Sequence, residues 1–138
     1  MPILAGLLAT VFALIAALHL YWTVRGVGTG AGVPSRADGT PVIRPGRLAS
    51  FAVTAACILA ALIVLGRGHL LDVGLPPAIL HVGIWGIAGV FFLRTIGEFR
   101  YVGLFKRVRG TPFADWDTRL FTPLCAAIAG AAVALAAT

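Results

Sequence analysis

Four long stretches of this chain contain no Asp, Glu, Lys or Arg, and they constrain its fold more than any other feature. They cover residues 1–24, 48–66, 73–93 and 120–138 of the 138 residues. Each stretch is about long enough to cross a ~30 Å hydrocarbon layer as a helix. Only helices and closed barrels satisfy their backbone groups in lipid, and these stretches lack the alternation of barrel strands. The sequence therefore predicts one all-α domain, an integral membrane four-helix bundle with helices near 2–24, 47–66, 76–98 and 117–138.

The basic residues predict which side of the membrane each loop faces. Four Lys and Arg lie in residues 25–47, one lies in 67–72 and six lie in 94–119. Loops rich in Lys and Arg remain on the cytoplasmic side of a membrane. We therefore expect loops 1 and 3 in the cytoplasm and both termini outside, an N-out/C-out topology. The net charge of +6 then predicts the lipid bilayer and its anionic headgroups as partners, and we expect no nucleic acid.

Segment 94–120 concentrates charged and aromatic side chains in a chain that is 59% apolar. Asp115 and Asp117 are expected to cap the last helix, because carboxylates favour the positive end of the helix dipole. Together with Arg119, they are also placed to fold back onto Arg94 or Arg100. This arrangement predicts an ordered polar lid over the cytoplasmic end of the bundle, and a solvated loop is the alternative.

His19 is the clearest polar side chain within a predicted span, and Tyr21 and Trp22 lie beside it. Polar groups inside a membrane are costly, so they mark functional sites by default. Imidazole exchanges protons near neutral pH, so His19 is a candidate for proton transfer or ligand binding. The alternative places His19 in an interfacial aromatic belt together with its two neighbours.

Arg94 and Glu98 lie four residues apart near the end of the third span, so they share one helix face and can form an ion pair. The first and third spans run in the same direction, which places His19 at a similar depth. This layer predicts a cytoplasmic-face site, and a purely structural ion pair is the alternative. The catalytic candidates are His19 and Glu98, and the ligand-binding candidates are Tyr21, Trp22, Arg94, Arg100, Tyr101 and Arg119.

The remaining histidines and cysteines predict no metal and no cofactor. His81 lies about 20 Å along the helix from Arg94, so we interpret it as packing at the outer interface. The three histidines also lack metal-ligand spacing. Buried Cys usually behaves as a small apolar residue, so we interpret Cys57 and Cys125 as packing residues. The glycine-rich stretch GVGTGAG, residues 26–32, lacks the Lys and the flanking strand and helix of a phosphate loop, and it predicts a flexible connector.

The sequences HLYW at 19–22 and RTIGEFRYVGLFKRVRGTPFADWDTRLFTPLC at 94–125, with the spacing of the four spans, resemble a known family. It comprises small bacterial integral membrane proteins and is catalogued as a domain of unknown function. The resemblance covers nearly the whole chain. It implies a multi-pass four-helix protein of the bacterial inner membrane, and it implies no activity, substrate or cofactor.

Together these patterns predict a small multi-pass membrane protein of unassigned biochemical activity. Its cytoplasmic-face polar cluster is expected to bind a lipid-like or anionic amphiphile or a protein partner. One alternative is a membrane enzyme in which His19 and Glu98 perform acid–base chemistry on a lipid or isoprenoid-like substrate. Another is a subunit of an oligomeric transporter, although the two halves show no inverted repeat. Small residues on the helix faces also allow contacts in a homo-oligomer.

Overall fold

The computed structural model describes residues 1–28 and 32–138, and every regular element in them is helical. The interpretation of GVGTGAG as a connector falls partly on residues 29–31, which lie outside the described residues. Within those residues the predicted all-α class is confirmed. The elements are α1 Pro2–Arg25, α2 Arg47–Arg67, α3 Pro77–Ile96, α4 Pro112–Trp116, the π-helical turn η1 Asp117–Phe121 and α5 Thr122–Ala136.

Four helices are long and apolar enough to cross a membrane, which confirms the predicted number of spans. They are α1, α2, α3 and the continuous helix Pro112–Ala136, in which α4, η1 and α5 follow one another without a break. Large apolar side chains such as Leu48, Val82 and Leu93 are exposed on the outside of these helices. In water such exposure would be unfavourable, whereas lipid accepts it.

The last helix begins five residues earlier than the sequence pattern predicts. Thr111 is its N-cap, and the Thr111 Oγ1 accepts a hydrogen bond of 3.1 Å from the backbone N–H of Ala114. Pro112 follows at the first helical position, where its missing N–H leaves no bond unmade. The helix therefore begins at Pro112, and Asp117 lies inside it rather than at its cap.

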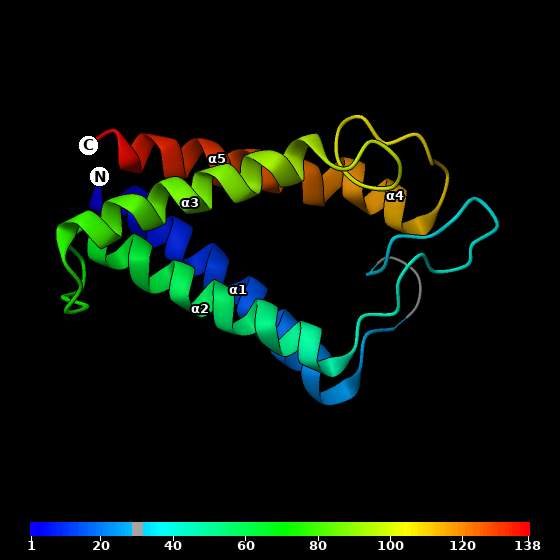
Figure 1. Cartoon of the computed structure of the whole chain (residues 1–138), viewed down its shortest axis with the longest axis horizontal. Helices are drawn as coiled ribbons and strands as arrows, with labels where there is room; N and C mark the ends of the chain where they lie inside the picture. Colours follow the sequence, from blue (N-terminus) through cyan, green and yellow to red (C-terminus); the bar gives the residue numbers. More distant parts are fainter. Residues whose placement is uncertain (29–31) are drawn as a thin grey trace.

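The helices pack as two pairs that diverge along the molecule. α1 lies along α2 and α3 lies along α5, while fewer contacts join one pair to the other. Figure 1 shows the pairs close together near the chain termini and well separated at the opposite end. The Phe12 and Phe91 rings connect the pairs edge to face, with centroids 5.6 Å apart. The shared core consists of Ala5, Leu8, Ala9, Phe12, Ala16, Cys57, Ala60, Val64, Ile84, Ile87, Ala88, Ile128, Ala132, Leu135 and Ala136.

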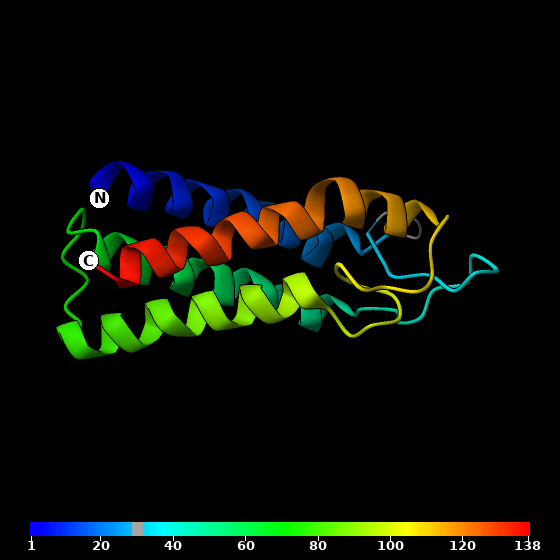
Figure 2. The same cartoon turned by 90° about the horizontal axis from the view of Figure 1, so that it is seen from above.

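The connecting segments lie at the two ends of the molecule, and the two segments rich in Lys and Arg lie at the same end. Residues 32–46 and 97–111 lie at one end, which we call the loop end (Figures 1 and 2). Both termini and residues 68–76 lie at the other, which we call the terminal end. The first and third loops therefore share one side of the bundle, whereas the side of the membrane that they face stays a prediction.

Candidate functional site

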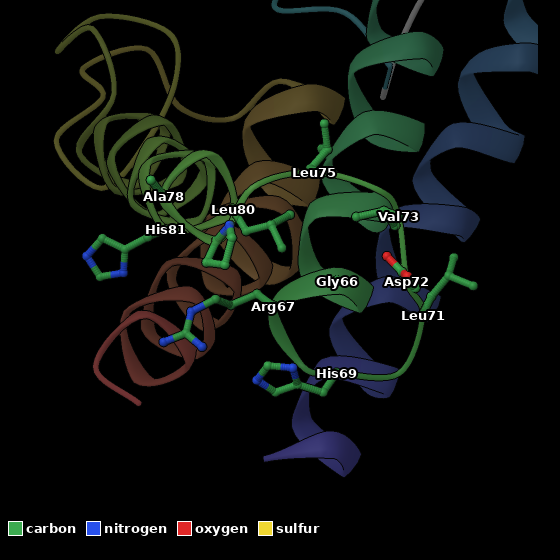
Figure 3. Close-up of a pocket in the computed structure, with 11 residues that line it drawn as sticks. Gly66, Arg67, His69, Leu71, Asp72, Val73, Leu75, Ala78, Leu80 and His81 are labelled. Carbon is green, nitrogen blue, oxygen red and sulfur yellow. The ribbon is translucent and has the colours of Figure 1, made fainter.

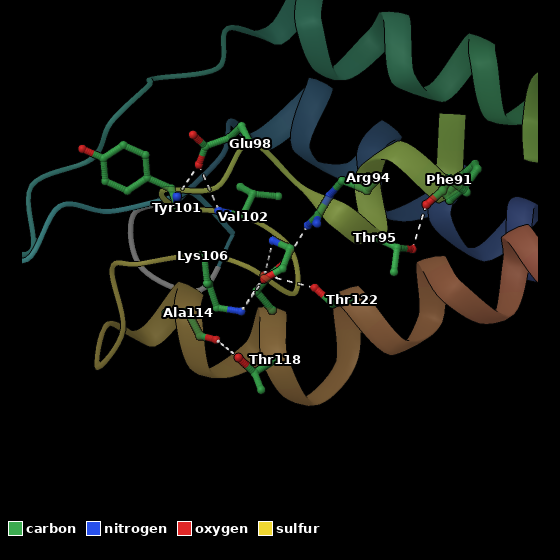
Figure 4. Close-up of polar contacts among 12 residues, drawn as sticks. Phe91, Arg94, Thr95, Glu98, Tyr101, Val102, Lys106, Ala114, Thr118 and Thr122 are labelled. Atoms are coloured by element: carbon green, nitrogen blue, oxygen red, sulfur yellow. Dashed lines mark hydrogen bonds and ion pairs between the residues drawn. The ribbon is translucent and has the colours of Figure 1, made fainter. Parts of the chain in front are cut away.

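Asp117 is the centre of a buried polar cluster at the loop end. Its Oδ1 accepts a hydrogen bond of 2.7 Å from Arg94 Nη2. Its Oδ2 accepts bonds from Lys106 Nζ at 3.0 Å, the Gly103 N–H at 2.9 Å and Thr122 Oγ1 at 3.1 Å. Figure 4 shows the Arg94, Lys106 and Thr122 side chains converging on this point. We call these five residues the Asp117 cluster.

The Asp117 cluster contains more positive than negative charge. The side chains of Asp117 and Lys106 are 0% and 2% exposed, and that of Arg94 is 31% exposed. Buried charges are stable only when they are paired and hydrogen-bonded, and here two cations share one carboxylate. The carboxylate accepts four hydrogen bonds in all, one at Oδ1 and three at Oδ2. The Asp117 carboxylate is therefore a structural junction between α3, the loop 97–111 and the last helix.

The π-helical turn brings Thr122 against Asp117. The Thr122 N–H bonds to the Asp117 carbonyl, five residues back rather than four. Pro123 follows, and a proline at this position removes one N–H and clashes with the carbonyl of Arg119, four residues earlier. The wider π turn accommodates that clash. The π turn thus aligns Thr122 Oγ1 with the carboxylate.

Two glycines let the loop 97–111 close back onto the end of α3. Gly97 and Gly103 have φ values of 82° and 89°, in the left-handed region that favours glycine. A β-carbon on Gly103 would lie 2.5 Å from the Ile96 carbonyl oxygen. The Leu104 N–H donates to the Thr95 carbonyl at 2.9 Å and fixes this return. The close crossing is what presents the Gly103 N–H to Asp117.

Glu98 stabilises the same loop instead of pairing with Arg94. Because α3 ends at Ile96, Glu98 lies beyond the helix and is not on the Arg94 face. Glu98 Oε1 accepts hydrogen bonds from the backbone N–H groups of Tyr101 and Val102. The expected Arg94–Glu98 ion pair is therefore wrong, and Arg94 pairs with Asp117.

His19 lies on the other helix pair. Its Nδ1 donates to the Ile15 carbonyl at 2.9 Å, and its ring packs edge to face on Trp22 with centroids 5.0 Å apart. Tyr21, beside them, is exposed. The loop ends of α1 and α3 are separated in Figure 1. Within the described residues, no hydrogen bond or ion pair joins His19 to Arg94 or Glu98, so the structure does not bring the two catalytic candidates together.

The remaining ligand-binding candidates lie on the surface of the loop end. The Arg100 guanidinium lies 5.2 Å from the Tyr101 ring centroid, a cation–π contact. Arg119 is exposed on η1, and so is Asp115 on α4. Of the residues expected to form the lid, Asp117 contacts Arg94 as predicted, and Asp115 and Arg119 face outward.

Two neighbouring hollows lie close to the Asp117 cluster, and the sequence pattern did not indicate them. The first, which we call the α3–α5 groove, has a volume of about 590 Å³ and is mainly apolar. The second, which we call the threonine pocket, has a volume of about 120 Å³. The two share Thr95 and Ala126 in their linings, so the groove and the pocket are neighbours. The groove is lined by Trp85, Ala88, Gly89, Phe92, Thr95, Ala126, Ala129, Gly130 and Val133, and the pocket by Thr95, Gly103, Leu104, Lys106, Arg109, Thr118, Thr122, Pro123 and Ala126.

Four apolar helices of spanning length in the described residues, two of them joined at one end by a buried polar cluster, define a multi-pass membrane protein. The chain belongs to the family described as "Protein of unknown function (DUF3995)", whose family model matches residues 12–132. This match confirms the predicted membership in a family of unknown function, and it includes every residue of the Asp117 cluster. Neither the comparison with curated proteins nor that with solved structures gave a match. Across the described residues, no three His, Cys, Asp or Glu side chains are grouped as metal ligands.

Proposed function

We propose that this membrane protein binds an anionic amphiphile, with its apolar chain in the α3–α5 groove and its headgroup at Arg109. One observation carries the proposal: an apolar groove of about 590 Å³ lies next to a small pocket whose lining includes the basic side chain of Arg109. Apolar and charged surfaces joined in this order match the two parts of a lipid-like molecule.

The groove has the size and lining of a site for an apolar chain. Ligand pockets commonly have volumes of about 300–1,000 Å³ and mainly apolar walls. Gly89 and Gly130 leave space between α3 and α5, because a β-carbon at either position would have no heavy atom within 4 Å. Trp85 and Phe92 provide aromatic surface along the same groove.

Arg109 is the cation that remains for a headgroup. Lys106 also lines the threonine pocket, but its ammonium is engaged by Asp117 and by the Gly103 carbonyl. Arg109 is exposed and forms no ion pair in the part of the chain that the structure describes. A guanidinium binds phosphate or carboxylate oxygens with paired N–H groups, so Arg109 fits an anionic headgroup.

The charge distribution supports an orientation for this site. Residues 25–47 and 94–119 contain four and six Lys and Arg, against one in 67–72. We infer that the loop end faces the cytoplasm of a bacterial cell, because basic loops remain inside. The anionic surface of that leaflet attracts the same residues and supplies anionic headgroups at the depth of Arg109. The enzyme and transporter alternatives stay predictions; in the described part of the chain, His19 bonds to the Ile15 carbonyl and Glu98 to the Tyr101 and Val102 N–H groups.

Headgroup recognition is tested by comparing Arg109→Gln with Arg107→Gln. Both variants remove one positive charge from the loop, but Arg107 borders a different hollow, with Glu98 and Val108. The purified protein is placed in nanodiscs that contain phosphatidylglycerol, and the retained lipid is counted by native mass spectrometry. We expect Arg109→Gln to weaken retention about tenfold, as the loss of one charge-assisted hydrogen bond predicts. Equal retention by the two variants would contradict the proposal.

The groove is tested by comparing Gly130→Leu with Gly86→Leu. A β-carbon meets no heavy atom within 4 Å at either glycine, but only Gly130 lines the α3–α5 groove. Filling the groove should exclude the lipid, whereas the same change at Gly86 should leave retention unaltered. If Gly130→Leu instead changes the oligomeric state and leaves lipid retention intact, the groove is a contact between copies of the chain and the proposal fails.

A further inference from the structure

A second cavity lies at the terminal end, away from the groove and Arg109. It has a volume of about 650 Å³ and is formed by the end of α2, the link 68–76 and the start of α3. Figure 3 shows its polar side chains, with the Arg67 guanidinium between the His69 and His81 rings in this view. Leu71, Leu75 and Leu80 form part of its apolar wall.

Arg67 brings to this cavity a positive charge that forms no ion pair with the residues that the structure describes. Its Nη2 donates to the Ala136 carbonyl at 3.5 Å, and its Nε is buried without a hydrogen-bond partner. Asp72 is the acidic residue of the lining, but its Oδ1 accepts the Gly74 N–H at 2.9 Å. Figure 3 places Asp72 on the far side of the cavity from Arg67. A buried donor without a partner is costly, so Arg67 is a ready donor for an anion.

His69 occupies a position where glycine would be more stable. The Leu70 N–H bonds to the Leu65 carbonyl at 2.9 Å and the His69 N–H to the Gly66 carbonyl at 3.1 Å. This pair of bonds is the Schellman motif, whose residue after the C-cap adopts a left-handed conformation and is usually Gly. His69 is that residue, with φ 55°. Its imidazole therefore occupies the cavity rim at a cost to local stability, which glycine would avoid.

His81 adds a third nitrogen-bearing side chain from another element. It lines the cavity from the first turns of α3 and packs edge to face on Trp85, with centroids 6.5 Å apart. Arg67, His69 and His81 thus come from α2, the link and α3 respectively. A carboxylate offers two oxygens in one plane, whereas a phosphate offers oxygens in several directions. Donors that approach from three elements therefore fit a phosphate better.

We propose that Arg67, His69 and His81 form a binding site for a phosphate group at the terminal end. The phosphate belongs either to a lipid headgroup, with its chain against Leu71, Leu75 and Leu80, or to a soluble phosphate. This site is separate from the α3–α5 groove, so its failure leaves the proposed function unaffected.

The test measures binding to the full-length protein in neutral detergent and in nanodiscs. Inorganic phosphate is titrated calorimetrically, and phosphatidic acid in phosphatidylcholine nanodiscs is followed by native mass spectrometry. Binding of inorganic phosphate identifies a soluble ligand, and binding of phosphatidic acid alone, weakened by Arg67→Gln but not by Arg109→Gln, identifies a headgroup at this site. If neither probe binds, the proposal is overturned.

Three variants make the test specific. Arg67→Gln should weaken binding about tenfold, and His69→Gly about fivefold, because each removes a donor to the anion. His69→Gly should also keep or raise the melting temperature, since glycine favours the left-handed conformation. Arg47→Gln, at the other end of α2, should leave binding unchanged. Wild-type binding by Arg67→Gln or His69→Gly, an equal loss in Arg47→Gln, or a lower melting temperature in His69→Gly would overturn the proposal.

Discussion

Arg94 Nη2 and Asp117 Oδ1 lie 2.7 Å apart, although the two residues are 23 positions apart in the sequence. The ion pair joins the last turn of α3 to the π turn of the last helix. Lys106 adds a second ion pair of 3.0 Å to the same carboxylate. The Asp117 cluster therefore fixes the loop 97–111 and both helices of the α3–α5 pair to one another at the loop end.

Asp117→Asn should destabilise the protein by about 3–5 kcal/mol, because it leaves Arg94 and Lys106 without their counter-charge in a buried site. The measurement is unfolding in detergent, followed by circular dichroism. Asp115→Asn is the matched control: Asp115 is exposed on α4, and its substitution should change stability by less than about 0.5 kcal/mol. Similar losses in both variants would show that the general acidity of the segment, and not the cluster, stabilises it.

Gly103→Ala should be more destabilising than Gly110→Ala. Both glycines have positive φ values, 89° and 78°, so alanine at either is expected to cost about 1–2 kcal/mol from backbone conformation. At Gly103 a β-carbon would also lie 2.5 Å from the Ile96 oxygen, whereas at Gly110 it would meet open space. We expect a further loss of about 1–3 kcal/mol from this overpacking. Melting curves of the two variants measure the difference. Equal melting temperatures would contradict the close approach of Gly103 to the end of α3.

Glu98→Ala should loosen the loop 97–106, whereas Glu98→Gln should not. The alanine removes the acceptor of the Tyr101 and Val102 N–H groups, and glutamine keeps one oxygen in its place. Losing about 1 kcal/mol of hydrogen bonding should speed local amide exchange about fivefold. Hydrogen–deuterium exchange of peptides from this loop measures the effect. If glutamine exchanges as fast as alanine, the charge of Glu98 and not its acceptor geometry fixes the loop.

The predicted topology is tested with cysteine labelling in intact cells. Ala37→Cys places a thiol in the exposed part of loop 1, and Leu71→Cys places one in the link at the terminal end. The native Cys57 and Cys125 are buried, so labelling of the unsubstituted protein measures the background signal. A membrane-impermeant maleimide should label Leu71→Cys before permeabilisation and Ala37→Cys only afterwards. The reverse order would place the basic loops outside.

Charge placement was enough to predict the spans, because a run without charges has few alternatives to a membrane helix. Residues that close the loops were harder to predict. Asp117 resembles a helix cap when only its own neighbours are considered, yet Thr111 is the cap and the helix begins at Pro112, five residues before Asp117. The Thr-Pro dipeptide was the available signal for that earlier start.

Two predicted contacts, Arg94 with Glu98 and His19 with Arg94, do not form within the described residues, for a reason that no pattern of spacing contains. The i to i+4 relation between Arg94 and Glu98 assumes a continuing helix, and Gly97 ends it with a φ of 82°. The proximity of His19 to Arg94 assumes parallel packing, whereas the helix pairs diverge at the loop end. Depth in the membrane is readable from sequence order, but lateral distance depends on crossing angles that side-chain packing determines.

All the bonds of Asp117 come from residues 94–122, so the cluster belongs entirely to the second helix pair. The shared core that joins the pairs lies mainly towards the terminal end. The contact between the Phe12 and Phe91 rings belongs to this junction between the pairs. The buried apolar contacts between the pairs and the buried ion pairs within one of them thus lie at opposite ends of the bundle.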